Sequence, residues 1–318
     1  MTNITESKIA VVGAGALGSY FGGLLARAGH PVTLIGRAGH VDAIKRSGLQ
    51  FLADGSEQRI SLAATVDVSA VRDASLVLFC VKSFDTEAAA AAIAPHLARD
   101  AVVLSLQNGV DNPERIGRHI RNQVIPVLVY VGANIPEPGV VRHTGGSNVV
   151  IGQLKAFRER APDGVLLADI AATFSGAGLT VKTSDDIEAD LWIKLLMNAT
   201  YNAVSALGRS AYARMVAMPE VNAIMRDAAA EVVAVAKAKG ICLPDDIIET
   251  AMKLADSMPQ TRSSTAQDIA KGRLTEVAYL NGAVAEQGRA LGVPTPVNGT
   301  LNALIKLLEQ AGSAAPGG

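Results

Sequence analysis

The fold is decided by residues 8–18, which read KIAVVGAGALG. Residues 8–12 hold four apolar side chains, two of them β-branched valines, and predict a buried strand. The three glycines that follow have the spacing Gly-x-Gly-x-x-Gly, and residues 19–29 continue as a helical segment that ends at a glycine. Residues 31–35, PVTLI, predict the next strand. A glycine turn placed between a strand and a helix in this way is typical of a site for a dinucleotide.

The residues of this turn suit the pyrophosphate of such a ligand. Gly13 permits the tight turn, Gly15 lets backbone N–H groups approach the phosphates, and Gly18 lets the helix pack closely on the sheet. The helix N-terminus adds partial positive charge. Glycine is common in this chain, with 30 residues among 318, so an incidental turn is the alternative. The flanking strands and helix favour a dinucleotide site, with the expected contacts Gly13, Ala14, Gly15, Ala16, Leu17 and Gly18.

The end of the second strand distinguishes two forms of the cofactor. An NAD site usually has an aspartate or a glutamate there, which accepts hydrogen bonds from the ribose 2′-hydroxyl. In this chain Gly36 and Arg37 follow the strand, and the next acid is Asp42. An arginine fork suits a 2′-phosphate, although a solvated arginine at a strand end is the alternative. We therefore predict NADPH/NADP as the cofactor, bound through Arg37.

The composition bounds the class of protein. With 49% hydrophobic and 19% charged residues, the chain is typical of well-buried globular proteins and is long enough for two domains. Its net charge of −1, with the two signs mixed along the chain, gives no electrostatic argument for nucleic acid or membrane as a partner. No uninterrupted apolar stretch reaches the roughly 18 residues of a membrane span. Cys80 and Cys242 lie in apolar surroundings, which predicts two buried thiols in the cytoplasm rather than a disulfide or a metal site.

Strand and helix patterns alternate through the first part of the chain. Nearly continuous apolar strands alternating with helices predict an α/β fold with a Rossmann-like, doubly wound parallel sheet. The expected helices include residues 41–48, 88–97 and 163–175. The expected strands are residues 8–12, 31–35, 49–52, 58–64, 75–81, 101–106, 124–131, 149–152 and 179–183.

Two polar residues follow buried strands of this predicted sheet. Lys82 comes after the strand at 75–81, and Asn108 comes after the strand at 101–106. Ligands of such sheets collect at the carboxyl ends of the strands. Lys82 could therefore reach a phosphate or a ribose, and the Asn108 amide offers both donors and an acceptor. A solvated loop lysine and a plain Asn-Gly turn are the alternatives.

Near residue 185 the pattern changes to long helices, so we predict domains at 1–184 and 185–318, the second all-helical. The first long helix, residues 186–207, has Lys194, Asn198 and Asn202 at positions i, i+4 and i+8, which places them on one face. Their neighbours are mostly apolar, and an unpartnered polar stripe in a buried wall would be costly. The stripe therefore lines a pocket, satisfies itself or is an ordinary solvated face.

Later helices are expected at residues 219–239, 245–256, 264–271, 276–291 and 299–310. Ser264 is placed to cap the helix at 264–271, which is compatible with a contact to substrate. Glu276 is expected in the first turn of the helix at 276–291, where an acid is common.

This set of motifs resembles the ketopantoate reductase (2-dehydropantoate 2-reductase) family over nearly the whole chain. The resemblance rests on the glycine turn, Arg37, Val81-Lys82, Gln107-Asn108-Gly109, the segment LWIKLLMNATYN at 191–202, Ser263-Ser264 and TEVAYLNG at 275–282. The spacing of Lys194, Asn198 and Asn202 together with the Thr-Glu-x-x-x-Leu-Asn-Gly segment is far more specific than the glycine motif. One departure is that residues 208–212, GRSAY, hold no counterpart of a substrate-contacting asparagine that family members can carry there.

The resemblance implies NADPH-dependent reduction of ketopantoate to (R)-pantoate, on the route to coenzyme A. Lys194 then matches the proton donor. The residues that match substrate contacts are Asn108, Lys194, Asn198, Asn202 and Ser264. Those that match cofactor contacts are Lys82, Asn108 and Glu276. A lysine that delivers a proton to the developing alkoxide needs a pKa lowered by burial, and a nearby Glu276 would oppose that shift.

Two other functions are compatible with the sequence. One is a related NADP-dependent reductase of another 2-oxo or imino acid, and the other is a dinucleotide-binding sensor without turnover. Apolar stripes on the helices at 276–291 and 301–308 lead us to expect a homodimer.

Overall fold

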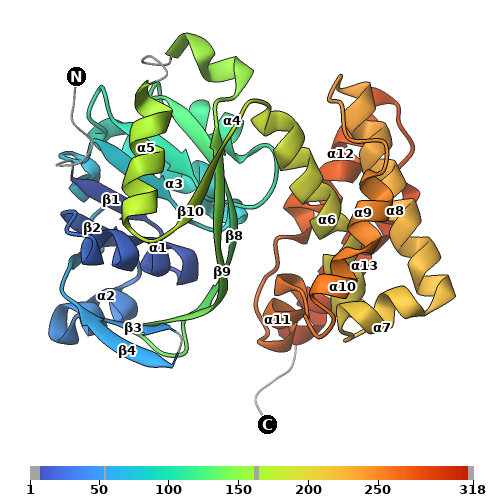
Figure 1. The fold of residues 1–318 in the computed structure, drawn as a ribbon, viewed down its shortest axis with the longest axis horizontal. Helices are drawn as coiled ribbons and strands as arrows, with labels where there is room; N and C mark the ends of the chain where they lie inside the picture. The colour runs from blue at the N-terminus through green and yellow to red at the C-terminus, as the bar shows by residue number, and fades with distance from the viewer. Residues whose placement is uncertain (1–7, 54, 161–164, 314–318) are drawn as a thin grey trace. The chain divides into compact units, whose positions relative to one another are not determined.

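The computed structural model describes residues 8–53, 55–160 and 165–313 (Figure 1). The chain divides into two compact units, which are described separately. The first comprises residues 1–107 and 111–187, and the second comprises residues 108–110 and 188–318. No helix among the described residues is both long enough and apolar enough to cross a membrane.

The first unit is built on one ten-stranded sheet with the order β4-β3-β9-β8-β7-β6-β1-β2-β5, and β10 pairs with β9 outside this path. The strands are β1 (Ile9–Val12), β2 (Val32–Ile35), β3 (Leu49–Ala53), β4 (Ser56–Ile60), β5 (Ala63–Thr65), β6 (Leu76–Phe79), β7 (Val102–Ser105), β8 (Val124–Asn134), β9 (Val140–Gly152) and β10 (Thr180–Ser184). Its helices are α1 (Ala16–Arg27), α2 (Ala38–Ser47), α3 (Thr86–Ile93), α4 (Asn112–Gly117) and α5 (Val165–Gly176).

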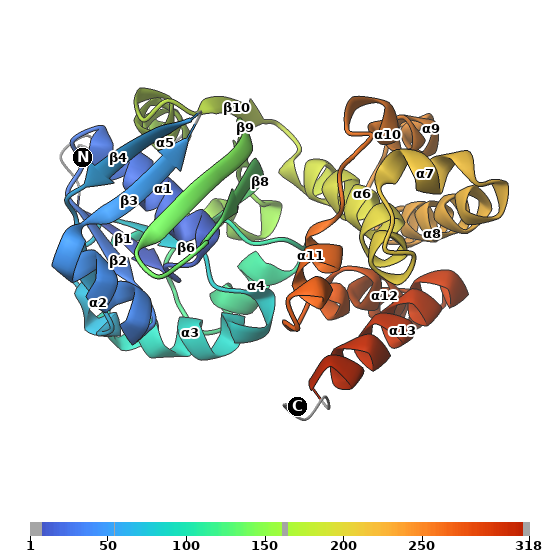
Figure 2. The ribbon, with the colours of Figure 1, turned by 90° about the horizontal axis from the view of Figure 1, so that it is seen from below.

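The central strands confirm the predicted fold class. β1 pairs in parallel with β2 on one side and β6 on the other, so Val12, Ile35 and Phe79 end at the same edge of the sheet. Helices α1 and α5 lie on one face and α3 and α4 on the other (Figures 1 and 2). Both faces are covered, so the central strands are buried along their whole length, which is why their sequences are continuously apolar.

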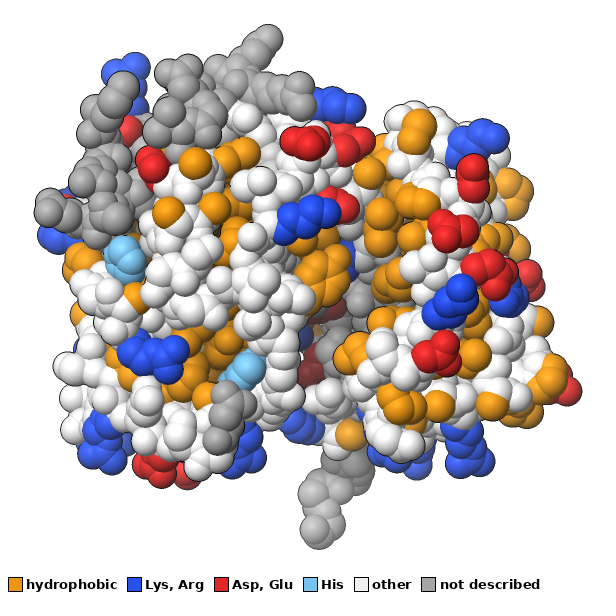
Figure 3. Space-filling view, viewed as in Figure 1, with side chains coloured by type: hydrophobic (Ala, Val, Ile, Leu, Met, Phe, Trp, Pro, Cys, Tyr) orange, Lys and Arg blue, Asp and Glu red, His pale blue; other side chains and the backbone are white. Residues whose placement is uncertain are grey.

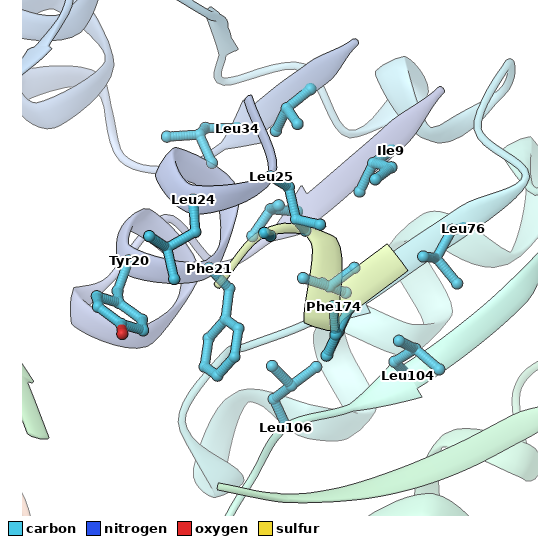
Figure 4. Close-up of a cluster of buried hydrophobic side chains, with 14 of the residues drawn as sticks. Ile9, Tyr20, Phe21, Leu24, Leu25, Leu34, Leu76, Leu104, Leu106 and Phe174 are labelled. Carbon is cyan, nitrogen blue, oxygen red and sulfur yellow. The ribbon is translucent and has the colours of Figure 1, made fainter. Parts of the chain in front are cut away.

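Helix α1 is almost completely enclosed, because it contacts β3, β4, β8 and β9 as well as β1 and β2. A Cβ at Gly22 would lie 2.5 Å from Leu34 of β2, and one at Gly23 would lie 3.0 Å from Phe51 of β3. These two glycines therefore let strands approach the helix from two sides. Figure 4 shows Phe21 and Leu25 of α1 beside Phe174 of α5 in the resulting core.

Two strand pairs are antiparallel, which adds a mixed region to the predicted parallel sheet. β3 and β4 form a hairpin, and β8 turns back on β9. Strands were expected from the sequence at 49–52 and 58–64 for the hairpin, but only at 124–131 and 149–152 for β8 and β9. Residues 140–148 alternate buried, intermediate and exposed side chains and include two glycines, so no continuous apolar run marks that strand.

The second unit is helical, as expected from the sequence. It contains most of α6 (Ile187–Leu207), and α7 (Tyr212–Ala217), α8 (Pro219–Ala238), α9 (Ile247–Met252), α10 (Leu254–Ser257), α11 (Ser264–Ala270), α12 (Asn281–Leu291) and α13 (Pro296–Ser313). α6, α8, α12 and α13 pack together around a core that includes Tyr201, Met225, Val232 and Val284 (Figures 1 and 2).

Three local expectations were wrong. The helix predicted at 276–291 is broken, because Val277–Tyr279 form a short 3₁₀ helix and Leu280 has φ −113° and ψ −97°, outside the helical region. The helix predicted at 245–256 is divided between α9 and α10. Cys242 is exposed rather than buried, since it lies in the connection between α8 and α9, whereas Cys80 is partly buried.

Candidate functional site

The glycine turn of the first unit has the backbone geometry that its sequence requires. Gly13 has φ +99°, a conformation that residues with a side chain rarely adopt. The N–H groups of Gly13 and Ala14 donate to Ile35 O at 3.0 and 2.9 Å, so the turn is joined to the end of β2. A Cβ at Gly18 would lie 2.2 Å from Gly13 O, so α1 can begin this close to the turn only with glycine there.

The turn leaves room for a phosphate at the start of α1. Gly15 is exposed, and a Cβ built on it would meet no atom within 4 Å. α1 begins at Ala16 and has no side-chain cap at its N-terminus. The first N–H groups of a helix lack intrahelical partners, so those of Ala16, Leu17 and Gly18 suit an anion at this position. The turn therefore fits the pyrophosphate of a dinucleotide.

Arg37 lies directly after β2 and is the N-cap residue of α2. Its side chain is exposed, and no carboxylate forms an ion pair with it in the part of the chain that the structure describes. Ile35 O accepts hydrogen bonds from the N–H groups of Gly13 and Ala14. Arg37 is only two residues after Ile35, so its backbone lies close to the glycine turn. A guanidinium in this position is suited to a 2′-phosphate.

Lys82 follows β6 at the same edge of the sheet, and a buried polar network holds its backbone on both sides. Gln107 Nε2 donates to Val81 O at 3.0 Å and to Thr86 Oγ1 at 2.7 Å. Asn112 Nδ2 donates to Ser83 Oγ at 3.2 Å, and Arg115 donates to Ser83 O at 2.8 Å. Asn112 and Arg115 come from α4, about 30 residues after Lys82, so no local sequence pattern predicts that they support it.

His40, which was not predicted from the sequence, also supports the turn. The backbone N–H of Gly139 donates to His40 Nδ1 at 2.9 Å, so Nε2 carries the proton and can donate to Ser19 Oγ, 3.0 Å away. Burial lowers the pKa of His40, which favours this neutral form. The first turn of α1 is thereby connected to α2 and to the loop before β9.

In the second unit, α6 carries the three predicted polar residues on one face. Lys194 and Asn198 are partly buried, and Asn202 is 5% exposed. The wall around them is apolar and includes Leu191, Trp192, Leu195 and Leu196, all buried. The stripe is therefore not an ordinary solvated face.

Asn108 and Glu276 meet near Lys194, although 168 residues separate them from each other in the sequence. Asn108 Nδ2 donates to Glu276 Oε2 at 3.4 Å, and Glu276 is 9% exposed. Burial lowers the pKa of Lys194 from 10.5 to about 8, and the charge of Glu276 opposes this shift. The desolvation of the ammonium is the larger effect. Lys194 can therefore hold a proton at neutral pH and release it readily.

Glu276 is held in place by the end of α13. Glu309 Oε1 accepts hydrogen bonds from the backbone N–H of Thr275 at 2.7 Å and from Thr275 Oγ1 at 2.6 Å. Thr275 Oγ1 also accepts the N–H of Val277 at 3.2 Å. Both neighbours of Glu276 are thus fixed, which gives the physical reason that a short 3₁₀ turn replaces the predicted helix start.

Ser263, and not Ser264, is the buried cap of α11. Its Oγ accepts the N–H of Ala266 at 3.1 Å and donates to Asn202 O at 3.0 Å, so this loop is attached to α6. Ser264 is the first residue of α11 and is exposed, which leaves its hydroxyl accessible.

Each unit thus gathers part of the predicted site. The first brings the glycine turn to the end of β2 ahead of Arg37, with Lys82 at the same sheet edge. The second brings Asn108 and Glu276 to Lys194 on the helix that also carries Asn198 and Asn202, and attaches the loop of Ser264 to that helix.

Comparison with protein families gives two matches that together span most of the chain. Residues 9–156 match the family described as ketopantoate reductase PanE/ApbA, and residues 186–309 match its C-terminal counterpart.

Relatives and solved structures agree with these matches. A 2-dehydropantoate 2-reductase of Halobacterium salinarum is 35% identical and covers 96% of this chain and 100% of the relative, and one of Pyrococcus horikoshii is 30% identical with 97% and 99% covered. The crystal structure of a PanE/ApbA family ketopantoate reductase from Ralstonia eutropha JMP134 is similar with a TM-score of 0.89 and 44% identity, covering 96% and 99% of the two chains. A D-mandelate dehydrogenase bound to NADH and anilino(oxo)acetate is similar with a TM-score of 0.88 and 28% identity, covering 96% and 100%.

Proposed function

The chain belongs to the ketopantoate reductase PanE/ApbA family, and on this basis we propose that it reduces 2-dehydropantoate to (R)-pantoate with NADPH, in pantothenate and coenzyme A biosynthesis. The observation that carries the proposal is the lysine of α6, whose pKa burial lowers to about 8 beside Glu276 and Asn108. We propose residues 1–184 as the NADP-binding domain and residues 185–318 as the substrate domain.

In this proposal the glycine turn and Arg37 hold the phosphates of the cofactor. The open space at Gly15 and the uncapped start of α1 support pyrophosphate binding by residues 13–18. Arg37 binds the 2′-phosphate, and Lys82, Asn108 and Glu276 provide further contacts. When bound, NADPH supplies the hydride that reduces the 2-oxo group.

Lys194 acts as the proton donor in this proposal. Reduction of a ketone leaves alkoxide character on the oxygen, and an ammonium on a rigid helix can stabilise that charge and then give up its proton. The buried carboxylate of Glu276 favours the protonated lysine and keeps part of the population charged near pH 8. Asn108, Asn198, Asn202 and Ser264 supply amide and hydroxyl groups for the polar groups of the substrate.

The test is to follow NADPH oxidation with 2-dehydropantoate, 2-oxoisovalerate, pyruvate and phenylglyoxylate. We expect the largest kcat/KM with 2-dehydropantoate. Preference for another oxo acid would contradict the substrate assignment only. Tight NADPH binding without oxidation by any of the four would contradict the enzyme assignment and favour a sensor.

A related reductase of another 2-oxo acid is the second candidate. It is favoured by the likeness to D-mandelate dehydrogenase and by the absence of an asparagine in residues 208–212. This candidate predicts that phenylglyoxylate, the oxo acid that corresponds to mandelate, is reduced faster than 2-dehydropantoate.

We further propose that the enzyme acts in the cytoplasm as a homodimer. Both cysteines are free thiols, which suits a reducing compartment. Leu291 at the end of α12 and Leu307 on α13 are 43% and 62% exposed, and a second copy could cover them. Light scattering should give twice the 32.8 kDa of one chain, and a strict monomer would contradict the dimer.

A further inference from the structure

The second unit has an apolar groove that contains none of the residues assigned above to the reaction. The end of α6, together with α7, α8 and α13, encloses a volume of about 710 Å³. Met218, Ile224 and Leu304 on its walls are 52%, 45% and 42% exposed. Large apolar side chains exposed together mark a binding surface, and the volume is in the range of sites for small ligands.

A second hollow of about 210 Å³ adjoins this groove, and Ser210 and Arg214 line both. Its other walls include Arg209, from the connection between α6 and α7, and Arg262, from the segment before α11. Three guanidinium groups therefore surround the end of an apolar groove. Figure 3 shows hydrophobic side chains over the lower part of this unit, around α7, and basic side chains along the edge below them.

No carboxylate among the described residues pairs with these arginines. Within the described ranges, Arg209, Arg214 and Arg262 have no ion pair or other electrostatic partner. In contrast, Arg226 on the neighbouring α8 pairs with Glu249. Three like charges around one hollow repel each other, and an anion between them would relieve this repulsion.

The backbone of the hollow is also unusual. Arg209 has φ +48°, which makes it the single described residue other than glycine with a positive φ. The Oγ of the next residue, Ser210, is buried and has no hydrogen-bond partner in the structure. Buried hydroxyls are normally satisfied, so an unpartnered hydroxyl in a residue that lines both hollows is unusual.

We propose that the groove and the hollow form one site for a soluble single-chain anionic amphiphile, with its carboxylate or phosphate head among Arg209, Arg214 and Arg262 and its acyl tail along the groove. Charge complementarity favours this occupant over a neutral apolar molecule, and the continuity of the two hollows through Ser210 and Arg214 favours a ligand with both parts. None of the residues proposed to act in the reduction lines the groove or the hollow, so the test is a binding measurement that does not depend on activity.

The experiment is calorimetric titration of the full chain with dodecyl phosphate, inorganic phosphate and dodecyltrimethylammonium. We expect one dodecyl phosphate per chain, much weaker binding of inorganic phosphate because it has no tail to bury, and much weaker binding of the cationic amphiphile. Equal binding of the two amphiphiles would overturn the proposal, because the arginines would then have no role.

Substitutions test separately how the anionic head and the apolar tail of the ligand contribute to its binding. Arg214→Ala and Arg262→Ala should each weaken dodecyl phosphate binding roughly ten- to a hundredfold, the range for a lost charge-assisted hydrogen bond. Arg289→Ala on α12 is the matched control and should bind as the wild type does. Leu304→Gln should weaken binding of the amphiphile without changing the binding of inorganic phosphate. Leu291→Gln changes a side chain of nearly equal exposure, 43% against 42%, and should have no effect on either.

All variants change exposed side chains, so each is expected to fold, and circular dichroism checks this. Light scattering of the wild type and of Leu304→Gln tests whether a second copy of the chain occupies the groove instead. If the wild type binds no dodecyl phosphate and Leu304→Gln converts a dimer to monomers, a second copy of the chain covers the groove and the proposal is wrong.

Discussion

The two units present their polar groups in opposite ways. The first offers backbone N–H groups at an uncapped helix end and an exposed Arg37, all at the edge of a rigid sheet. The second offers side chains in an apolar wall, where burial changes the proton affinity of Lys194. Backbone groups and an exposed guanidinium suit recognition of phosphates, whereas a desolvated ammonium suits proton transfer. In the proposed function, phosphate recognition therefore belongs to the first unit and proton transfer to the second.

Substitution of Lys194 is expected to have the largest effect, and it should lower kcat without changing cofactor affinity. Lys194→Ala should lower kcat by roughly 10²- to 10⁴-fold, the range for a lost general acid. The Kd for NADPH should barely change, because the glycine turn and Arg37 are intact. Steady-state kinetics and a fluorescence titration with NADPH measure the two quantities. Lys194→Arg should not restore activity, since a guanidinium does not release its proton.

The free energy of unfolding, measured against pH, tests whether unfolding could cause that loss. Because burial lowers the pKa of Lys194 from 10.5 to about 8, the folded state binds fewer protons than the unfolded state between these values, and the charged lysine costs stability at neutral pH. Lys194→Met should therefore be more stable than the wild type at pH 7, and the gain should shrink as the pH rises from 8 to 10.5. An inactive variant that is also much less stable would point to a structural role.

Substitution of Arg37 should weaken the binding of NADPH without affecting the reduction step. Arg37→Ala should raise the KM for NADPH by about ten- to a hundredfold, which corresponds to the roughly 1.5–3 kcal/mol of a charge-assisted hydrogen bond. The KM for NADH should stay nearly unchanged, because NADH has no 2′-phosphate. Equal losses with both cofactors would mean that Arg37 supports the turn and does not select the cofactor.

The smallest effect on activity is expected from substitution of Glu309, which positions Glu276 through Thr275. Glu309→Ala leaves the N–H and Oγ1 of Thr275, a residue only 5% exposed, without their acceptor, which costs roughly 1–3 kcal/mol of stability. It should also lower kcat several-fold and shift its pH profile. Glu309→Gln keeps one acceptor oxygen and should retain most of the activity. A loss of thermal stability without any change in the pH profile would show that Glu309 is structural only.

The same contrast explains how much the sequence could predict. The glycine turn and the stripe of Lys194, Asn198 and Asn202 depend on neighbours within a few residues, so their spacing alone placed them on a turn and on one helix face. The contact of Asn108 with Glu276 joins positions 168 residues apart, and no periodicity reports such a distance.

The remaining differences have local causes. Glu276 was expected in the first turn of a helix at 276–291, but the hydrogen bonds of Thr275 with Glu309 and Val277 favour a tighter turn. Ser263 and Ser264 are adjacent, and only the contact of Ser263 with Asn202 O shows which one is the cap. The segment of β9 at 140–148 was missed because its two glycines and mixed burial hide the alternation of a strand.

The central claim is that a partly buried Lys194, whose pKa shift Glu276 opposes, is the proton donor. The pH dependence of kcat in the wild type and in Glu276→Gln tests this claim most directly. The wild-type kcat should fall above about pH 8, as Lys194 loses its proton. Glu276→Gln removes the charge that favours the ammonium, so the pKa of Lys194 falls further and the decline should begin at lower pH. A decline that stays in place or moves to higher pH in Glu276→Gln, or that persists in Lys194→Ala, would contradict the account.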